Sequence, residues 1–127
     1  ENRMRFPLEV AEAVAAVLPA HMTWGGRITG SEWLEGGITP DEAATLAREL
    51  KARGASFVCV SSAGNSPLSR IPATPGYQVP FAAHVKAHAG EGLAVRAVGD
   101  EFDPTGLRAF DHGLAAGREG KASHRDV

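Results

Sequence analysis

FVCVSSAGNSP, at residues 57–67, carries the clearest structural signal in the chain. Its first four residues are all apolar, which is typical of a strand buried on both faces of a parallel sheet. The chain then turns into Ser, Gly, Asn and Pro, which favour loops and offer hydroxyls, amides and bare backbone. Ligands of parallel α/β proteins gather at this edge, beyond the carboxyl ends of the strands. We therefore expect a binding site just after this strand.

Two further strands are predicted, at residues 22–28 and 93–98. Helical patterns separate or flank the three strands, and they cover residues 7–18, 39–54, 80–90 and 103–114. This repeating order of strand and helix predicts parallel strands joined by right-handed crossovers. It leaves two parent folds open, a slice of a (β/α)₈ barrel or a small open sheet.

The second of these helices has the strongest start signal. Thr39 can cap it, Pro40 fits the first helical position, and Glu42 completes a capping box. Gly54 is placed to end the helix in a left-handed conformation. For the first helix, Pro7 is expected at the first position and Pro19 beyond the end.

The composition excludes several classes of protein. A chain of 127 residues is long enough to form one domain with a buried core. We therefore predict a single segment at residues 1–127, in which the tail at 117–127 has no clear pattern of apolar residues. A net charge of −2 does not provide the excess of positive charge that is typical of nucleic-acid-binding proteins. No apolar run is long enough to cross a membrane, and a single cysteine fits the cytoplasm. The chain begins at Glu1 without an initiator Met, so we expect it to start partway into a longer protein.

Several separate motifs resemble one family. They are ENRMRFP at 1–7, RI at 27–28, WLEGG at 33–37, VSSAG at 60–64, PGYQVPFA at 75–82 and AVG at 97–99. Together they resemble the Old Yellow Enzyme family of flavin-dependent ene-reductases, and PGYQVPFA is closest to its bacterial xenobiotic reductases. The resemblance extends to about residue 104 and identifies barrel units five to seven.

The resemblance implies the fold class α/β, as part of a TIM (β/α)₈ barrel built from parallel βα repeats. It implies a cytoplasmic enzyme that passes a hydride from NAD(P)H through FMN to an activated, enone-type alkene. A homo-oligomer is compatible with it, whereas nucleic acid and membrane partners are not expected. In the family the substrate-binding His pair and the Tyr proton donor belong to the first four units. No catalytic residue is therefore assigned, and we expect the isolated chain to be inactive.

Four residues are assigned to the cofactor by this resemblance: Arg27, Gly99, Gly117 and Arg118. Arg27 would stabilise negative charge at N1 and the C2 oxygen of the flavin, although an arginine paired with a nearby acid is the simpler interpretation. Gly99 would let backbone N–H groups approach the phosphate. Gly117 and Arg118 resemble the family's phosphate-binding pair, but they come early in the chain.

Other candidates favour structural roles. His84 and His88 have a spacing that can bind metal, but no third ligand is predicted, so no metal site is assigned. Ser61 and Ser62 lack the surroundings of a serine nucleophile. Cys59 is expected to be an inert buried thiol. The alternative to an oxidoreductase segment is a non-catalytic αβ half-barrel that binds no flavin on its own.

Overall fold

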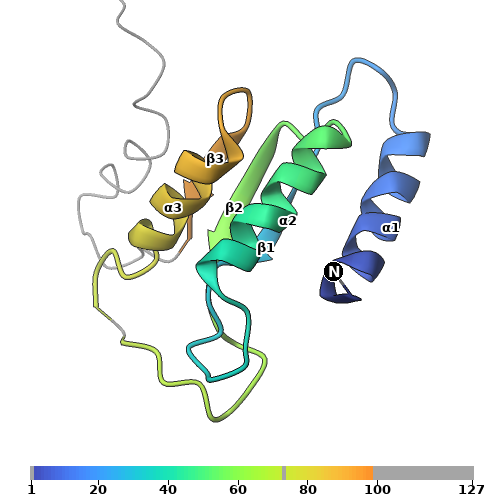
Figure 1. The fold of residues 1–127 in the computed structure, drawn as a ribbon. Helices are drawn as coiled ribbons and strands as arrows, with labels where there is room; N and C mark the ends of the chain where they lie inside the picture. The colour runs from blue at the N-terminus through green and yellow to red at the C-terminus, as the bar shows by residue number, and fades with distance from the viewer. Residues whose placement is uncertain (1, 73, 99–127) are drawn as a thin grey trace, which may run out of the picture.

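The computed structural model describes residues 2–72 and 74–98. Within these residues helices and strands alternate along the chain (Figure 1). The elements are α1 (Asn2–Val17), β1 (Gly25–Thr29), α2 (Pro40–Ala52), β2 (Phe57–Ser61), α3 (Val79–Ala89) and β3 (Ala94–Ala97). The helix predicted at 103–114 lies outside the described residues. None of the helices in the described ranges is long and apolar enough to cross a membrane.

The three strands form one parallel sheet in the order β1-β2-β3. The prediction of adjacent, parallel strands is therefore confirmed. Both crossovers carry the chain in the same direction across the sheet, so connections of one hand place α2 and α3 on the same face. Figure 1 shows these two helices together in front of the strands. A barrel arc and half of an open sheet share this arrangement, so strand order alone does not choose between the two parent folds.

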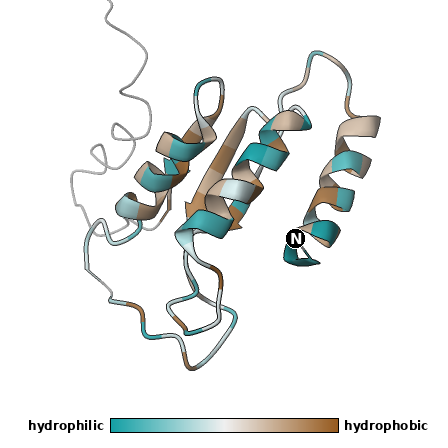
Figure 2. Cartoon of the chain, in the orientation of Figure 1, coloured by the Kyte–Doolittle hydropathy of each residue, from teal (hydrophilic) through white to brown (hydrophobic). Residues whose placement is uncertain are grey.

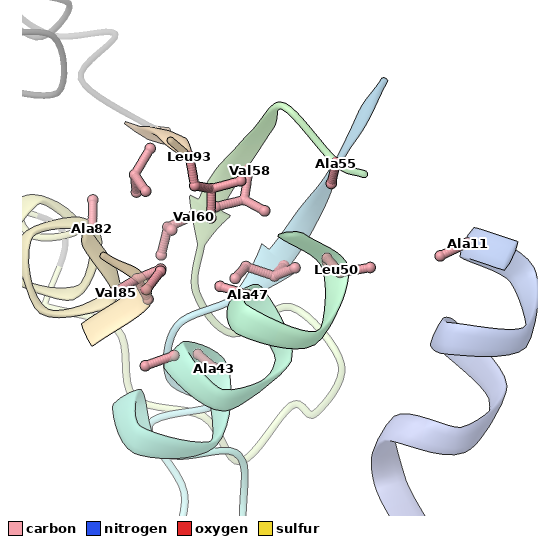
Figure 3. Close-up of a cluster of buried hydrophobic side chains, with 14 residues drawn as sticks. Ala11, Ala43, Ala47, Leu50, Ala55, Val58, Val60, Ala82, Val85 and Leu93 are labelled. Atoms are coloured by element: carbon pink, nitrogen blue, oxygen red, sulfur yellow. The ribbon is translucent and has the colours of Figure 1, made fainter. Parts of the chain in front are cut away.

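The core lies between the sheet and the inward sides of α2 and α3 (Figure 3). Val58 and Val60 of β2 and Val85 of α3 are completely buried, and so is Ala47 of α2. Small alanines along α2 let this helix approach both the sheet and α3 closely, which favours dense packing. Figure 2 shows β2 as a hydrophobic strand behind helices that carry hydrophilic residues outward.

The opposite face of the sheet, which we call the open face, carries the more exposed side chains. Phe57 is 39% exposed and Cys59 is half-buried, whereas Val58 and Val60 are at 0%. The prediction that β2 is buried on both faces is therefore wrong for the described residues. The expectation of a buried thiol at Cys59 is wrong for the same reason, because side chains alternate between the two faces of a strand.

Helix α1 lies beyond the β1 edge of the sheet and is loosely packed (Figure 1). Ala11 is its one buried residue, while Phe6 is 73% exposed and Val17 is 79% exposed. The helix begins at Asn2, so Pro7 lies inside it and not at its first position as predicted. The chain leaves the helix at Val17, before Pro19, as expected.

A groove of about 460 Å³ separates α1 from the edge of β1. Phe6, Val10 and Val14 line it from α1, and Trp24 and Ile28 line it from the sheet side. Strand β1 ends the sheet order, so its outer backbone edge has no strand partner among the described residues. The groove thus combines a free strand edge with an apolar helix face.

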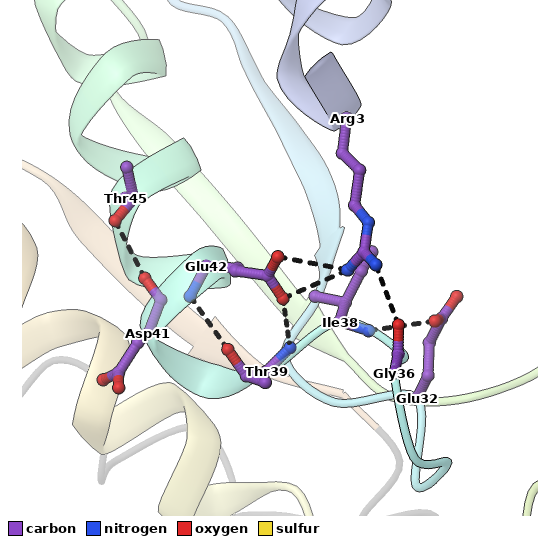
Figure 4. A network of polar contacts seen from close by, with 8 residues as sticks. All are labelled: Arg3, Glu32, Gly36, Ile38, Thr39, Asp41, Glu42 and Thr45. Carbon is purple, nitrogen blue, oxygen red and sulfur yellow. Dashed lines mark hydrogen bonds and ion pairs between the residues drawn. The ribbon is translucent and has the colours of Figure 1, made fainter. Parts of the chain in front are cut away.

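The start of α2 has the predicted capping box (Figure 4). The Glu42 backbone N–H donates to Thr39 Oγ1, and the Thr39 N–H donates to Glu42 Oε2 at 2.9 Å. This bond from the Thr39 backbone, helped by the charge of Arg3, lowers the pKa of Glu42. Gly54 follows the helix with φ +94°, the left-handed conformation that the sequence predicts. Local sequence signals therefore determine both ends of α2.

Two glycines near β1 have opposite surroundings. A Cβ at Gly30 would lie 2.7 Å from Val60 Cγ1 and 2.8 Å from Phe81 Cβ, whereas a Cβ at Gly26 would meet nothing within 4 Å. We predict that Gly30→Ala lowers the free energy of unfolding by about 1–3 kcal/mol through overpacking. Gly26→Ala is the matched control and should leave stability unchanged or raise it slightly, because alanine loses less backbone entropy than glycine. Equal urea midpoints for the two variants, followed by circular dichroism, would contradict this packing.

The capping box gives a second prediction. Thr39→Ala should lower the free energy of unfolding by about 1 kcal/mol at pH 7. The lowered pKa of Glu42 means that ionised Glu42 stabilises the fold above its ordinary value of 4.5, and that this contribution is lost as pH falls through the lowered value. Thr39→Ala keeps the backbone N–H that donates to the Glu42 carboxylate, so Glu42→Gln tests this pH dependence: the difference in free energy of unfolding between wild type and Glu42→Gln should narrow in acid. Thr45→Ala, in the interior of α2, is the control and should show neither effect.

Candidate functional site

Three side chains of the open face stand side by side across the sheet. Arg27 of β1 pairs in register with Cys59 of β2, and Cys59 pairs with Arg96 of β3. We call these residues the arginine row. They alternate with buried residues on each strand, so their side chains point to the open face. Two guanidinium groups therefore flank a thiol on this surface.

The next row lies nearer the carboxyl ends of the strands. It pairs Thr29 with Ser61, whose hydroxyls can both donate and accept hydrogen bonds. By the same alternation these hydroxyls share the open face with Arg27. The open face thus offers cationic and hydroxyl donors in neighbouring rows, an arrangement suited to an electron-rich ligand.

Arg27 is exposed, and no described residue gives it a hydrogen bond or an ion pair. None of the three strands contains an Asp or Glu. The simpler interpretation, an arginine neutralised by a nearby acid, has no support among the described residues. Arg27 lies at the middle of β1, two residues before the strand ends at Thr29, so it is one row below the carboxyl edge of the sheet.

The loops beyond the carboxyl ends of β1 and β2 are bonded to each other. The Gly30 N–H donates to the Ser61 carbonyl at 2.7 Å, and the Ala63 N–H donates to the Ser31 carbonyl at 2.8 Å. Glu32 accepts a hydrogen bond from the Ile38 N–H at 2.9 Å within its own loop. These bonds hold the two loops as one layer above the sheet.

This layer contains strained backbone. Trp33 has φ +53° and Ala63 has φ +55°, values that residues other than glycine rarely adopt. The Trp33 ring packs edge-to-face against Phe81 of α3, with centroids 5.2 Å apart. Strained residues persist where their surroundings hold them, and they cluster at functional sites. The strain therefore supports the expectation that this edge carries the site.

Buried polar atoms without partners lie near the same edge. Ser62 is 7% exposed and Gln78 is 4% exposed, yet no described residue forms a hydrogen bond with Ser62 Oγ, Gln78 Oε1 or Trp33 Nε1. Ser62 continues the alternation that buries Val60, so its hydroxyl faces the helices and not Arg27. The residue next to it, Ser61, is the serine that shares the open face with Arg27.

The remaining predicted site residues cannot be placed beside Arg27. Gly99, Gly117 and Arg118 lie outside the described residues. His84 and His88 lie on α3, where their rings stack with centroids 4.0 Å apart, and His84 Nε2 is 2.8 Å from Asp41 Oδ1. Within residues 2–72 and 74–98 no group of three or more His, Cys, Asp or Glu could hold a metal ion.

Sequence reasoning missed Arg96. The run LAVRAV at 93–98 was predicted to be a strand, and its single charged residue was assigned no role. A period of two along this strand would have placed Arg96 on the face opposite Val95, and aligning the three strands would have brought it level with Arg27. The alignment of the strands was therefore the missing signal.

Known proteins similar to this chain are NADPH dehydrogenases. The enzyme from Geobacillus thermodenitrificans is 37% identical over 94 residues, which cover 71% of this chain and 26% of that protein. The enzyme from a Geobacillus species is 36% identical over 103 residues, which cover 78% of this chain and 28% of that protein. The enzyme from Bacillus cytotoxicus is 35% identical over 103 residues, which cover 78% of this chain and 27% of that protein. The chain thus spans about a quarter of the length of these relatives.

No protein-family model matches the chain. The three relatives nevertheless agree with each other and cover more than two thirds of this sequence. They confirm the resemblance drawn from the separate sequence motifs, and the chain belongs to the Old Yellow Enzyme family.

Proposed function

We propose that this chain is the part of an FMN-dependent, NAD(P)H-linked oxidoreductase that binds the pyrimidine end of the flavin. One observation carries the proposal: Arg27 presents an exposed guanidinium, without a partner among the described residues, on the open face of a parallel sheet. The name of the relatives, NADPH dehydrogenase, supports a nicotinamide reductant.

The residues present fit such a ligand. FMN, when bound, would supply the hydride transfer from NAD(P)H to an activated alkene such as an enone. The Arg27 guanidinium would donate to the pyrimidine C2 oxygen, and its charge would stabilise negative charge that develops at N1. The hydroxyls of Thr29 and Ser61 offer further donors in the next row of the same face. The chain's own contribution is therefore orientation and electrostatic stabilisation.

We further propose that the sheet is an arc of a (β/α)₈ barrel, with the open face turned to the barrel interior. Barrel interiors are filled by side chains from every strand. The apolar residues Phe57 and Ala94 on the open face suit such an interior better than they suit solvent. The free edge of β1 and the adjacent apolar groove are suited to a further strand. The relatives, about four times as long as the matched segment, have enough chain for the remaining units.

The isolated chain should then bind FMN poorly. It supplies one flank of the cofactor, so much of a flavin ring would stay in water and little apolar area would be buried. We predict no saturable fluorescence quenching at micromolar FMN, and no NADPH-dependent reduction of an enone by purified residues 1–127. Micromolar FMN binding with steady turnover would show instead that the chain completes its site by self-association.

A chimera tests the role of Arg27 directly. The segment of this chain that matches the Geobacillus thermodenitrificans NADPH dehydrogenase would replace the corresponding segment of that enzyme. We predict a yellow, flavin-loaded chimera in which Arg27→Ala slows flavin reduction by NADPH about tenfold or more, because a charge-assisted hydrogen bond is lost.

Arg48→Ala in the same chimera is the matched control. Arg48 is an exposed arginine of α2 that bonds Thr45 Oγ1 at 3.2 Å, away from the open face. Thermal unfolding should be similar for both variants. If the chimera folds without flavin, the non-catalytic half-barrel is the better description. If both arginine variants reduce flavin equally fast, Arg27 has no electrostatic role.

A further inference from the structure

Three polar side chains near the carboxyl edge of the sheet have no role in the proposed function. They are Trp33, Ser62 and Gln78, and the atoms Trp33 Nε1, Ser62 Oγ and Gln78 Oε1 are buried without a hydrogen-bond partner among the described residues. Ser62 and Gln78 are more than nine-tenths buried, so bulk solvent does not supply the missing bonds. A buried polar group without a hydrogen bond costs free energy, and native proteins rarely leave one unsatisfied.

The contact between β2 and α3 places Ser62 and Gln78 at one level of the fold. A Cβ at Gly30 would lie 2.7 Å from Val60 Cγ1 and 2.8 Å from Phe81 Cβ, so Val60 and Phe81 are neighbours. Ser62 lies two residues beyond Val60 on the same side of the chain, toward the carboxyl edge. Helix α3 runs back against the parallel strands, so Gln78, three residues before Phe81, also lies toward that edge.

The loop between β1 and α2 brings Trp33 to the same place. Its ring packs edge-to-face against Phe81, with centroids 5.2 Å apart. The Ser31 carbonyl accepts from the Ala63 N–H at 2.8 Å, and the Ser31 hydroxyl accepts from the Trp33 N–H at 3.1 Å. Ala63 directly follows Ser62, and Figure 1 shows the loops after β1 and β2 at the same end of the sheet. The three polar side chains therefore converge from two loops and the start of α3.

The chemistry of the three atoms fits one water molecule. The Trp33 indole N–H can only donate, Gln78 Oε1 can only accept, and the Ser62 hydroxyl can do either. The Gln78 amide nitrogen already donates to the Tyr77 hydroxyl at 3.2 Å, so the amide oxygen is the atom that needs a partner. Buried waters make about three hydrogen bonds to polar groups that lack other partners. We propose that Trp33, Ser62 and Gln78 bind one buried water, which accepts from the indole and donates to the amide oxygen.

This water ties the carboxyl edge of the sheet together. It joins the loop after β1 to the end of β2 and to the start of α3. The positive φ values of Trp33 and Ala63 lie beside it, and strained backbone persists where its surroundings hold it. A water with three protein partners is one such restraint. The site does not depend on flavin binding, so its test is separate from that of the proposed function.

Transfer of NMR magnetisation from water tests the site in the full 127-residue chain. The chain has two tryptophans, so a nitrogen-15 spectrum contains two indole N–H signals, and Trp24→Phe assigns them. We expect the Trp33 indole proton to show cross-peaks to water of opposite sign in laboratory-frame and rotating-frame NOE spectra, as a water that stays in place produces. Passing solvent and exchange of the indole proton with water both give equal signs. Equal signs or no cross-peak in the wild-type chain would overturn the proposal.

Variants separate a bound water from the Ser62 hydroxyl proton, which exchanges with solvent and can relay the same signal. Ser62→Ala and Gln78→Met each remove one partner, so each should weaken the Trp33 cross-peak, and the double variant should abolish it. Ser61→Ala is the matched control, because this neighbouring hydroxyl points to the open face, and it should leave the cross-peak unchanged.

Two results with the variants would contradict the water site. Loss of the cross-peak in Ser62→Ala, with a full cross-peak in Gln78→Met, would identify the hydroxyl relay instead. An unchanged cross-peak in the double variant would show that neither side chain holds the water. Circular dichroism checks that each variant is folded, and Gln78→Leu replaces Gln78→Met if the latter is not. The wild-type measurement decides the proposal where no variant folds.

Discussion

The parallel hydrogen bonding of β1 to β2 and of β2 to β3 is the constraint on which the rest of this structure depends. It sets the register that pairs Arg27 with Cys59 and Cys59 with Arg96. Because side chains alternate along each strand, the same register that buries Val58 and Val60 under the helices sends these three residues to the other face. A shift by one residue would exchange the two sets and place both arginines in the core. Core packing and the candidate site therefore depend on a single alignment.

The chain covers one side of its sheet and leaves the other side open. Alanines of α2, with Val85 and Leu93, complete the packing against the helix-covered face. The open face, the β1 edge and the stripe of apolar residues on α1 have no comparable cover among the described residues. Exposed strand edges and apolar stripes promote association with other chain segments. We therefore interpret the described fold as a unit whose second surface is suited to further polypeptide.

Local signals were read correctly from the sequence, and signals that depend on distant segments were not. The capping box at Thr39 and the left-handed Gly54 involve neighbours within a few residues, and both are confirmed. Burial of β2 on both faces was wrong, because an apolar run does not reveal what covers it. Arg96 was missed because its importance comes from alignment with Arg27, some seventy residues earlier in the chain. The site could be predicted as far as Arg27, since the family motif marks that residue.

The charges on the open face also limit what can cover it. Phe57 and Ala94 attract an apolar partner, but the arginine row lies beside them and would be desolvated by the same contact. Two copies of this chain placed open face to open face would bring like charges together without a carboxylate from either sheet, which is unfavourable. For Arg27, which has no partner among the described residues, a suitable cover must combine apolar side chains with negative charge, supplied by acidic residues or by a bound anion. A barrel that closes around an anionic ligand meets both requirements, whereas symmetric pairing of two such sheets meets the apolar requirement alone.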